Sequence, residues 1–203
     1  MRTQARLHAP MRSAEFDKEH VLRQAMTAFM QHGYSKTSMQ KLTQATGLHP
    51  GSIYCAFNNK KGLLLASVEQ YQKDKNAQFA QLCASHDNIK SALQAFLTDI
   101  AHPCASNEAT KVCLLTRTLS EVDGQDDEVT QVLSNNLSAF ERSLEDVLNK
   151  AMKKGEISSK PSAKERAQFL VMGIYGLRTY ASTGNDTQAL NRLSEQLLEY
   201  VLR

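Results

Sequence analysis

The chain has 203 residues and a formal net charge of +3, with 41% hydrophobic and 22% charged residues. These values are ordinary for a globular protein, and the length is sufficient to bury a core without disulfides. No apolar stretch approaches the roughly 18 residues that a membrane span needs, and the basic N-terminus lacks the apolar region of a secretory signal. Four cysteines without a CxxC spacing predict neither a disulfide framework nor a zinc site, so we expect no metal or cofactor and a reducing, cytoplasmic location.

The charge is unevenly distributed along the chain. Residues 1–65 carry nine basic and three acidic side chains, whereas the rest of the chain carries 15 basic and 18 acidic ones. A basic N-terminal third indicates a polyanionic partner at that end, although an asymmetry of this size also arises by chance. Residues 1–14 lack periodicity and are expected to form a flexible basic arm. Its arginines either contact DNA or are simply solvated: Arg2, Arg6 and Arg12.

Three helical segments follow the arm. Apolar residues recur at helical spacing after Asp17, a plausible N-cap, and Gly33 follows the last turn as a C-cap does. Two short helices come next, separated by Gly47, and Pro50 is tolerated in the first turn of the second. The expected ranges are 17–32, 38–46 and 49–57. Short helices joined by a glycine-centred turn are typical of a helix-turn-helix motif.

A longer helix begins at Lys60 and runs to about Leu82 with no flexible linker, so the domain boundary near residue 65 falls inside it. Further helices are expected over residues 88–102, 108–122, 128–154, 162–182 and 187–202. The sequence therefore predicts an all-α fold of about nine helices, in which a continuous helix joins a three-helix headpiece to a larger helical body. The expected parts are the arm (1–14), the headpiece (15–65) and the body (66–203).

The stretch from Thr37 to Val68, TSMQKLTQATGLHPGSIYCAFNNKKGLLLASV, resembles the DNA-binding domain of the TetR family of bacterial repressors. The matching features are the threonine before the second helix, the ATGL turn, the GSIYCAF recognition helix and the lysine before an apolar fourth helix. Two features depart from the family pattern, the Cys55-Ala56 pair and Lys61, and we expect them to alter operator preference or packing more than the fold. The resemblance implies a sequence-specific transcriptional repressor that a small molecule or a reactive species releases from its operator.

A major groove admits one α-helix, and the segment 49–57 has the features that a recognition helix needs. Small residues at its start allow close approach to DNA, and the free N–H groups there suit a phosphate. The expected DNA contacts are Thr37 (as the N-cap of the second helix), Gln40, Lys41, His49, Gly51, Ser52, Tyr54 and Lys60. Taken singly, Thr37, His49 and Tyr54 are equally compatible with ordinary capping or surface positions, and the joint spacing carries the prediction. The expected core residues of the same segment are Met39, Leu42, Ile53 and Phe57.

The resemblance also implies that the C-terminal part binds a small-molecule effector and forms a homodimer. The two apolar helices over 162–182 and 187–202 are expected to form a four-helix dimer interface, with Gly173 and Gly176 permitting close helix approach. Alternatively, these helices complete the core of a monomer. An effector pocket between the middle helices is expected to be lined by Phe96, Ile100, Cys113, Arg117, Phe140, Met172 and Tyr175.

Two of these pocket residues have competing interpretations, and in both cases we favour the simpler one. Arg117 lies in an otherwise apolar helix, where it pairs with an anionic ligand or, more simply, with Glu121. Cys113 lies in a KVCLL segment that resembles a GCLL-like segment of family members that sense reactive electrophiles, and Lys111 or Arg117 could lower the pKa of its thiol. The simpler interpretation is a buried and inert cysteine.

Two other classes of protein compete with the repressor. A helical enzyme is disfavoured because the sequence contains no HExxH, no GxSxG and no phosphate-cradling glycine loop. A DNA-binding activator or architectural protein without a ligand is the remaining alternative. The sequence therefore predicts a DNA-binding repressor without enzymatic activity or membrane association. Its partners are a palindromic double-stranded DNA operator, a second copy of the chain and a small-molecule effector.

Overall fold

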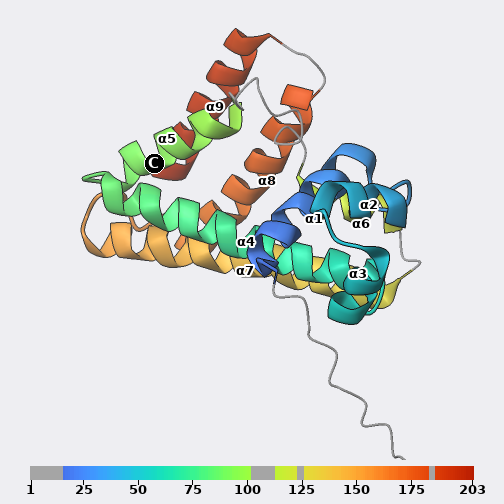
Figure 1. The fold of residues 1–203 in the computed structure, drawn as a ribbon. Coiled ribbons are helices and arrows are strands. Elements are labelled where there is room, and N and C mark those ends of the chain that lie inside the picture. The colour runs from blue at the N-terminus through green and yellow to red at the C-terminus, as the bar shows by residue number, and fades with distance from the viewer. Residues whose placement is uncertain (1–15, 102–112, 123–125, 183–185) are drawn as a thin grey trace, which may run out of the picture.

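The computed structural model describes residues 16–101, 113–122, 126–182 and 186–203. Over these residues the protein consists of nine helices and contains no strand (Figure 1). The helices are α1 (Lys18–His32), α2 (Met39–Thr46), α3 (Pro50–Phe57), α4 (Lys60–Ser85), α5 (Ile89–Ala101), α6 (Leu114–Val122), α7 (Asp127–Lys153), α8 (Ala163–Ser182) and α9 (Thr187–Leu202). The predicted all-α fold of about nine helices is confirmed. The arm with Arg2, Arg6 and Arg12, and also Lys111, lie outside the described residues.

The ends of the first helices follow the capping chemistry expected from the sequence. The carboxylate of Asp17 accepts a hydrogen bond from the backbone N–H of His20, 3.0 Å away, at the start of α1. Gly33 ends α1 with a φ of +82°, and Gly47 ends α2 with a φ of +70°. Both values lie in the region of backbone conformation that favours glycine, so these two residues fix the directions of the α1–α2 and α2–α3 connections.

The two longest helices, α4 and α7, run side by side through the molecule, and the other helices gather at their two ends (Figure 1). At one end α1 and α3 pack on α4, α2 packs on α1 and α3, and α6 lies against α1. At the other end α5 packs on the later turns of α4, α8 packs on α7, and α9 packs on α5 and α8. The helix α4 is unbroken through residue 65, so the headpiece and the body share one rigid element.

Two hydrophobic cores correspond to these two ends. The headpiece core includes Leu42, Ile53 and Phe57, and it extends into α6 and the start of α7 through Leu114 and Val129. The second core is formed by α5, α8, α9 and the later part of α7. The headpiece is therefore packed against α6 and α7 as well as connected through α4, and a displacement of α6 must disturb the core that supports the headpiece. No helix in the described part of the chain is long and apolar enough to cross a membrane.

Candidate nucleic-acid interface and buried cavity

One face of α3 is packed into the headpiece core and the opposite face is exposed. Ile53 and Phe57 are buried, whereas Tyr54 is 50% exposed, an unusual value for a large aromatic side chain. His49 precedes the helix with an extended backbone and forms no side-chain cap. Pro50 has no N–H, and the N–H of Ser52 bonds the carbonyl of His49 at 3.0 Å. The N–H of Gly51 therefore has no side-chain acceptor from His49, and together with the helix dipole it favours an anion at this end.

Six of the eight predicted DNA-contact residues lie together on α2 and at the start of α3. Gln40, His49, Gly51 and Tyr54 are exposed, and Lys41 and Ser52 are half-buried. The predicted core residues Leu42, Ile53 and Phe57 are buried, and Met39 packs against them. This surface, made of Gln40, Lys41, His49, Gly51, Ser52 and Tyr54, is called the α2–α3 surface below.

Thr37 does not belong to this surface. Its side chain is fully buried, and its hydroxyl donates a hydrogen bond of 2.5 Å to the carbonyl of Gly33. The N-cap of α2 is Ser38, whose hydroxyl accepts from the N–H of Lys41 at 3.2 Å. The prediction that Thr37 caps α2 and contacts a phosphate is therefore wrong. Carbonyls at the C-terminal end of a helix lack helical partners, and the Thr37 hydroxyl satisfies one of them.

Lys60 also has an internal role. Its ammonium donates to the carbonyls of Tyr34 (2.9 Å) and Thr37 (3.1 Å), reaches that of Ser35 at 3.5 Å, and lies 4.6 Å from the centre of the Tyr34 ring. Burial lowers the pKa of this ammonium below its ordinary value. An ammonium has three N–H donors, and here all three are used inside the protein. In this structure Lys60 holds the α1–α2 connector, and its contact with a phosphate stays a prediction.

Arg117 and Glu121 connect α6 to the headpiece. The Arg117 guanidinium donates from Nε to Glu121 at 3.1 Å and from Nη1 to the carbonyl of Met30 at 2.6 Å. The second carboxylate oxygen of Glu121 accepts from the N–H of Ser35 at 3.0 Å. Arg117 therefore faces α1, and the simpler interpretation of this residue is confirmed. The sequence analysis did not predict that this pair would reach the headpiece, because the contact joins residues more than 80 positions apart.

A small cavity lies where α4, α6, α7 and α8 meet. Its walls are formed by Tyr71, Gln72, Lys75, Phe96, Cys113, Leu115, Phe140, Tyr175 and Arg178, and its free space is about 20 Å³. Four of the seven predicted pocket residues line it: Phe96, Cys113, Phe140 and Tyr175. The other three predicted residues do not line this cavity. Arg117 faces the headpiece, Ile100 is buried in the second core, and Met172 is 61% exposed on α8.

Cys113 is buried at the edge of this cavity and has a polar neighbour. The hydroxyl of Tyr71 donates to its Sγ atom over 3.8 Å, and Arg178 donates from Nη1 to the oxygen of Tyr71 at 3.1 Å. Burial raises the pKa of Tyr71 above its ordinary value, so the phenol keeps its proton at neutral pH. Tyr71, Lys75 and Arg178 were not predicted from the sequence. An arginine within the largely apolar segment of α8 is a signal that could have identified Arg178, whereas Lys75 lies in a polar stretch of α4 that gives no such signal.

The outer face of α8 and α9 is apolar and open. It exposes Met172, Tyr180, Leu193 and Tyr200. A groove of about 380 Å³ on this face is lined by Phe169, Gly173, Gly176, Leu177, Tyr180, Leu193, Gln196 and Leu197. A Cβ atom on Gly173 would lie 2.4 Å from the Leu197 side chain, so this glycine permits the approach of α9 within the chain, whereas Gly176 has nothing within 4 Å. Both glycines predicted at the dimer interface line this groove, and only Gly173 is also needed for the packing of α9 within the chain.

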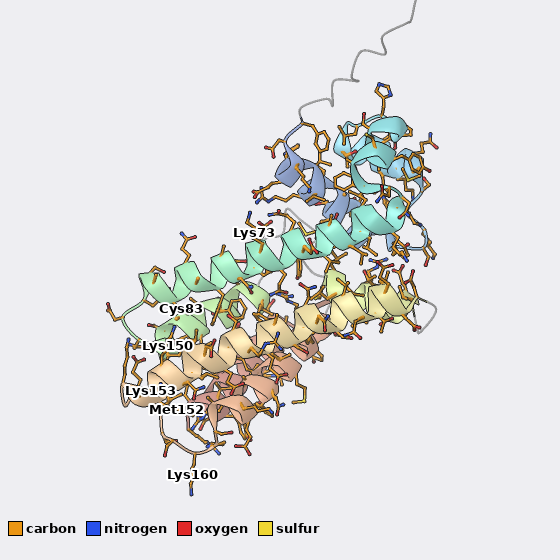
Figure 2. All side chains as sticks on the ribbon, turned by 90° about the horizontal axis from the view of Figure 1, so that it is seen from below. Lys73, Cys83, Lys150, Met152, Lys153 and Lys160 are labelled. Atoms are coloured by element: carbon orange, nitrogen blue, oxygen red, sulfur yellow. The ribbon has the colours of Figure 1, made fainter. Side chains whose placement is uncertain are left out.

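The other described cysteines lie away from the cavity. Cys55 is exposed on α3. Cys83 is half-buried at the end of α4 that lies far from the headpiece, near Lys150 of α7 (Figure 2), and burial raises the pKa of its thiol. Cys104 lies outside the described residues. Among the described residues, no group of three or more His, Cys, Asp or Glu side chains is arranged to hold a metal ion.

Comparison with known protein families identifies both parts of the chain. A family model described as "Bacterial regulatory proteins, tetR family" matches residues 21–67. A second model, described as "Tetracyclin repressor-like, C-terminal domain", matches residues 90–197. The second match alone covers more than half of the chain, and the first covers the helix-turn-helix.

Individual proteins resemble the chain over most of its length. The HTH-type transcriptional repressor ComR of Escherichia coli (strain K12) is 28% identical over 180 residues, which cover 88% of this chain and 86% of that protein. The TetR family regulator CifR, solved with 26-base-pair operator DNA, is 22% identical with a TM-score of 0.76, covering 91% of this chain and 96% of that one. The reduced form of E. coli NemR is 16% identical with a TM-score of 0.78, covering 88% and 93%.

Proposed function

Because the chain belongs to the TetR family and is a DNA-binding transcriptional repressor that acts as a homodimer on double-stranded operator DNA, we propose that the α2–α3 surface is its operator-contacting surface. In this proposal α3 enters the major groove, with His49 and Tyr54 at base edges or sugars and the open N-terminal turn of α3 at a phosphate. Gln40 and Lys41 on α2 contact the backbone beside the groove. The observation that carries the proposal is the exposed face of α3, with its half-exposed tyrosine and uncapped first turn.

Dimerisation supplies the second half of operator recognition. One headpiece reads only a few base pairs, and two headpieces related by a two-fold axis read a palindrome with half-sites about 34–36 Å apart. The exposed apolar face of α8 and α9, with Met172, Leu193 and Tyr200, is the surface that we propose for pairing with the second copy. A C2 interface uses the same patch on both chains, and this patch is continuous along the two helices.

Release from the operator is proposed to pass through α6. At its first residues this helix contributes Leu115 to the cavity, and within the next two turns it contacts the headpiece through Arg117 and Glu121. An effector in the cavity that displaces α6 shifts the α1–α2 connector, and with it the spacing of the two headpieces. Such an effector favours the released state by its differential affinity for the two states. We place this regulator in the cytoplasm, where its DNA lies, and assign it no catalytic activity.

The test is operator binding by a variant of Tyr54. Duplexes are first selected from a random library by the full-length dimer, and affinity is then measured by fluorescence anisotropy at one fixed salt concentration, because phosphate contacts make affinity salt-dependent. We expect Tyr54→Ala to weaken binding at least tenfold while the melting temperature stays within about 2 °C, since the side chain is half-exposed. Tyr54→Phe separates the contribution of the hydroxyl from that of the ring. Unchanged affinity of Tyr54→Ala would remove α3 from the interface.

A further inference from the structure

Two other cations of this protein, one half-buried and one buried, have several oxygen acceptors each. Lys60 donates to three backbone carbonyls. Arg166, which is fully buried, donates to the carbonyls of Pro161, Ser158, Lys160 and Val201 and to the Ser158 hydroxyl. A buried charge is tolerated when its donors are satisfied in this way. The number of oxygen acceptors around Lys60 and Arg166 can be compared with the number around the cations of the cavity.

Lys75 and Arg178 have fewer oxygen acceptors than Lys60 and Arg166. The Lys75 ammonium donates to one neutral acceptor, the amide oxygen of Gln78 at 3.1 Å, and lies 5.9 Å from the centre of the Tyr71 ring. Arg178 donates to the hydroxyl of Tyr71. Among the described residues, no carboxylate lies within 4 Å of either cation. Asp74, the acid nearest to Lys75 along α4, is already bonded to Arg23 at 2.8 Å.

The two cations therefore place two like charges at one partly desolvated cavity. The charge of Lys75 is disfavoured there: burial lowers the pKa of Lys75 below its ordinary value, and the charge of Arg178 lowers it further, against the opposing effect of the Asp99 and Asp74 carboxylates. The remaining polar groups of the cavity, Tyr71, Tyr175 and Cys113, are neutral when they carry their protons. A negatively charged group that entered the cavity would be paired with both cations at once, and would gain the strong hydrogen bonds that charged donors and acceptors form.

We propose that this cavity is an anion-binding site and that the effector is a small monocarboxylate with an apolar body, its carboxylate held by Lys75 and Arg178. The apolar body is accommodated by Phe96, Leu115 and Phe140, which line the same cavity. This inference rests on the proposed function, because it names the chemistry of the molecule that acts through α6.

The small size of the cavity links binding of the carboxylate to release of the protein from its operator. Free space of about 20 Å³ holds little more than one ordered water. A carboxylate with several carbon atoms therefore fits only when the helices around the cavity separate. Leu115 and Cys113 lie on the α6 side of the cavity and Arg178 lies on α8. The ligand thus binds the widened state preferentially, which is the differential affinity that a population shift requires.

The experiment measures the melting temperature of the reduced, full-length protein with formate, acetate, butyrate and benzoate at constant ionic strength. The neutral amide of each acid serves as its paired control. We expect butyrate or benzoate to raise the melting temperature by roughly 5 °C more than its amide at saturation. Lys75→Met and Arg178→Gln abolish the difference, and Arg178→Lys retains part of it. Arg142→Gln, which changes an exposed arginine of α7 outside the cavity, retains all of it.

Three results would overturn the proposal. The first is equal stabilisation by acid and amide throughout the series. The second is a carboxylate effect that survives both Lys75→Met and Arg178→Gln. The third is a protein that responds only to peroxide and loses that response in Cys113→Ser, because the anion is then the oxidised cysteine itself. Operator binding is measured on the same preparations without ligand. Intact operator binding with no carboxylate effect refutes this inference alone, whereas absent operator binding refutes the proposed function.

Discussion

Two lysines of α4, Lys60 at the start of the helix and Lys75 at the cavity, show how one helix serves two purposes. At its start, Lys60 is surrounded by backbone carbonyls of the α1–α2 connector. Four turns later, Lys75 lies at a cavity beside a second cation. Burial lowers the pKa of both ammonium groups. Only the first has its three donors occupied by the protein, so the first lysine is a structural element of the headpiece and the second is available to a ligand.

This difference separates the functions of the two regions. The headpiece uses its own polar groups to fix its shape: Thr37 bonds Gly33, Glu121 bonds Ser35, and Lys60 joins the connector to α4. The part of the headpiece that remains available to a partner is the exposed α2–α3 surface. The cavity differs, since its apolar residues are packed and its two cations, Lys75 and Arg178, have no carboxylate partner within 4 Å in the part of the chain that the structure describes. A molecule that recognises the headpiece contacts it from outside, whereas one that recognises the cavity must enter it.

The strongest test of this comparison replaces each lysine with methionine, which keeps most of the volume and removes the charge. Lys60→Met is expected to lower the free energy of unfolding by about 3 to 4 kcal/mol, because charged hydrogen bonds to the carbonyls of Tyr34 and Thr37 are lost and the Tyr34 carbonyl keeps only the N–H of Thr37, 3.4 Å away. Lys75→Met is expected to leave the free energy unchanged or to raise it by up to about 1 kcal/mol, since it removes an unpaired charge. Urea denaturation followed by circular dichroism measures both values.

The control for this pair is Lys61→Met. Lys61 is a partly exposed lysine that pairs with Asp126 (3.3 Å) and Glu128 (2.6 Å) at the start of α7, and exposed pairs of this kind contribute less than about 1 kcal/mol. If Lys60→Met were no more destabilising than Lys61→Met, the contrast between the two ends of α4 would be lost. A large destabilisation by Lys75→Met would have the same consequence, because Lys75 would then be structural as well.

A second test concerns the tight contact between α6 and the headpiece. A Cβ atom on Gly33 would lie 2.2 Å from a carboxylate oxygen of Glu121, and the φ of +82° at this residue is strained for any other side chain. Gly33→Ala is expected to cost about 2 to 3 kcal/mol. Gly47→Ala shares the positive φ but meets nothing within 4 Å, and it is expected to cost about 1 kcal/mol. Chemical denaturation of both variants gives the difference.

The difference between these glycines should shrink in a Glu121→Ala background, where the clash is removed and only the backbone strain remains. An unchanged difference would show that Glu121 is easily displaced from the headpiece. The route from α6 to the α1–α2 connector would then have to depend on Arg117 alone.

The sequence predicted the helices well because capping and periodicity are local properties. Asp17, Gly33 and Gly47 mark helix ends through their own backbone and side-chain chemistry, and each range differs from the structure by only a few residues where the structure describes it. The exposed and buried faces of α3 were likewise predictable, because Ile53 and Phe57 are four positions apart and Tyr54 lies off that face.

The roles of polar residues were predicted less well because they depend on contacts distant in sequence. Thr37 and Ser38 are both competent N-caps, and only the packing of Thr37 under α1 decides that Ser38 forms the cap. Arg117 and Arg178 both lie in largely apolar helices. Their positions relative to α1 and to the cavity decide that the first bonds the headpiece and the second faces the ligand site. Local patterns identify such residues as unusual without showing what they face.

The smallest expected effect tests the outer surface of the headpiece. Gly51 is helical and exposed, and a Cβ atom there meets nothing within 4 Å. Gly51→Ala is therefore expected to leave the free energy of unfolding unchanged, or to raise it by up to about 1 kcal/mol through helix propensity. The added methyl group would stand where the backbone of α3 approaches DNA, so we expect operator affinity to fall about fivefold, measured by anisotropy at fixed salt.

Cys55→Ala is the matched control, because it shortens a neighbouring exposed side chain of α3 without adding volume. A Gly51→Ala protein that is as stable as the wild type and binds operator equally well would show that α3 does not approach DNA at its first turn. A protein that loses both stability and affinity would show that Gly51 is needed for folding. Lost affinity with retained stability is the one outcome that supports the proposal. It would show that the polar groups inside the headpiece maintain its fold, while the exposed α2–α3 surface contacts DNA.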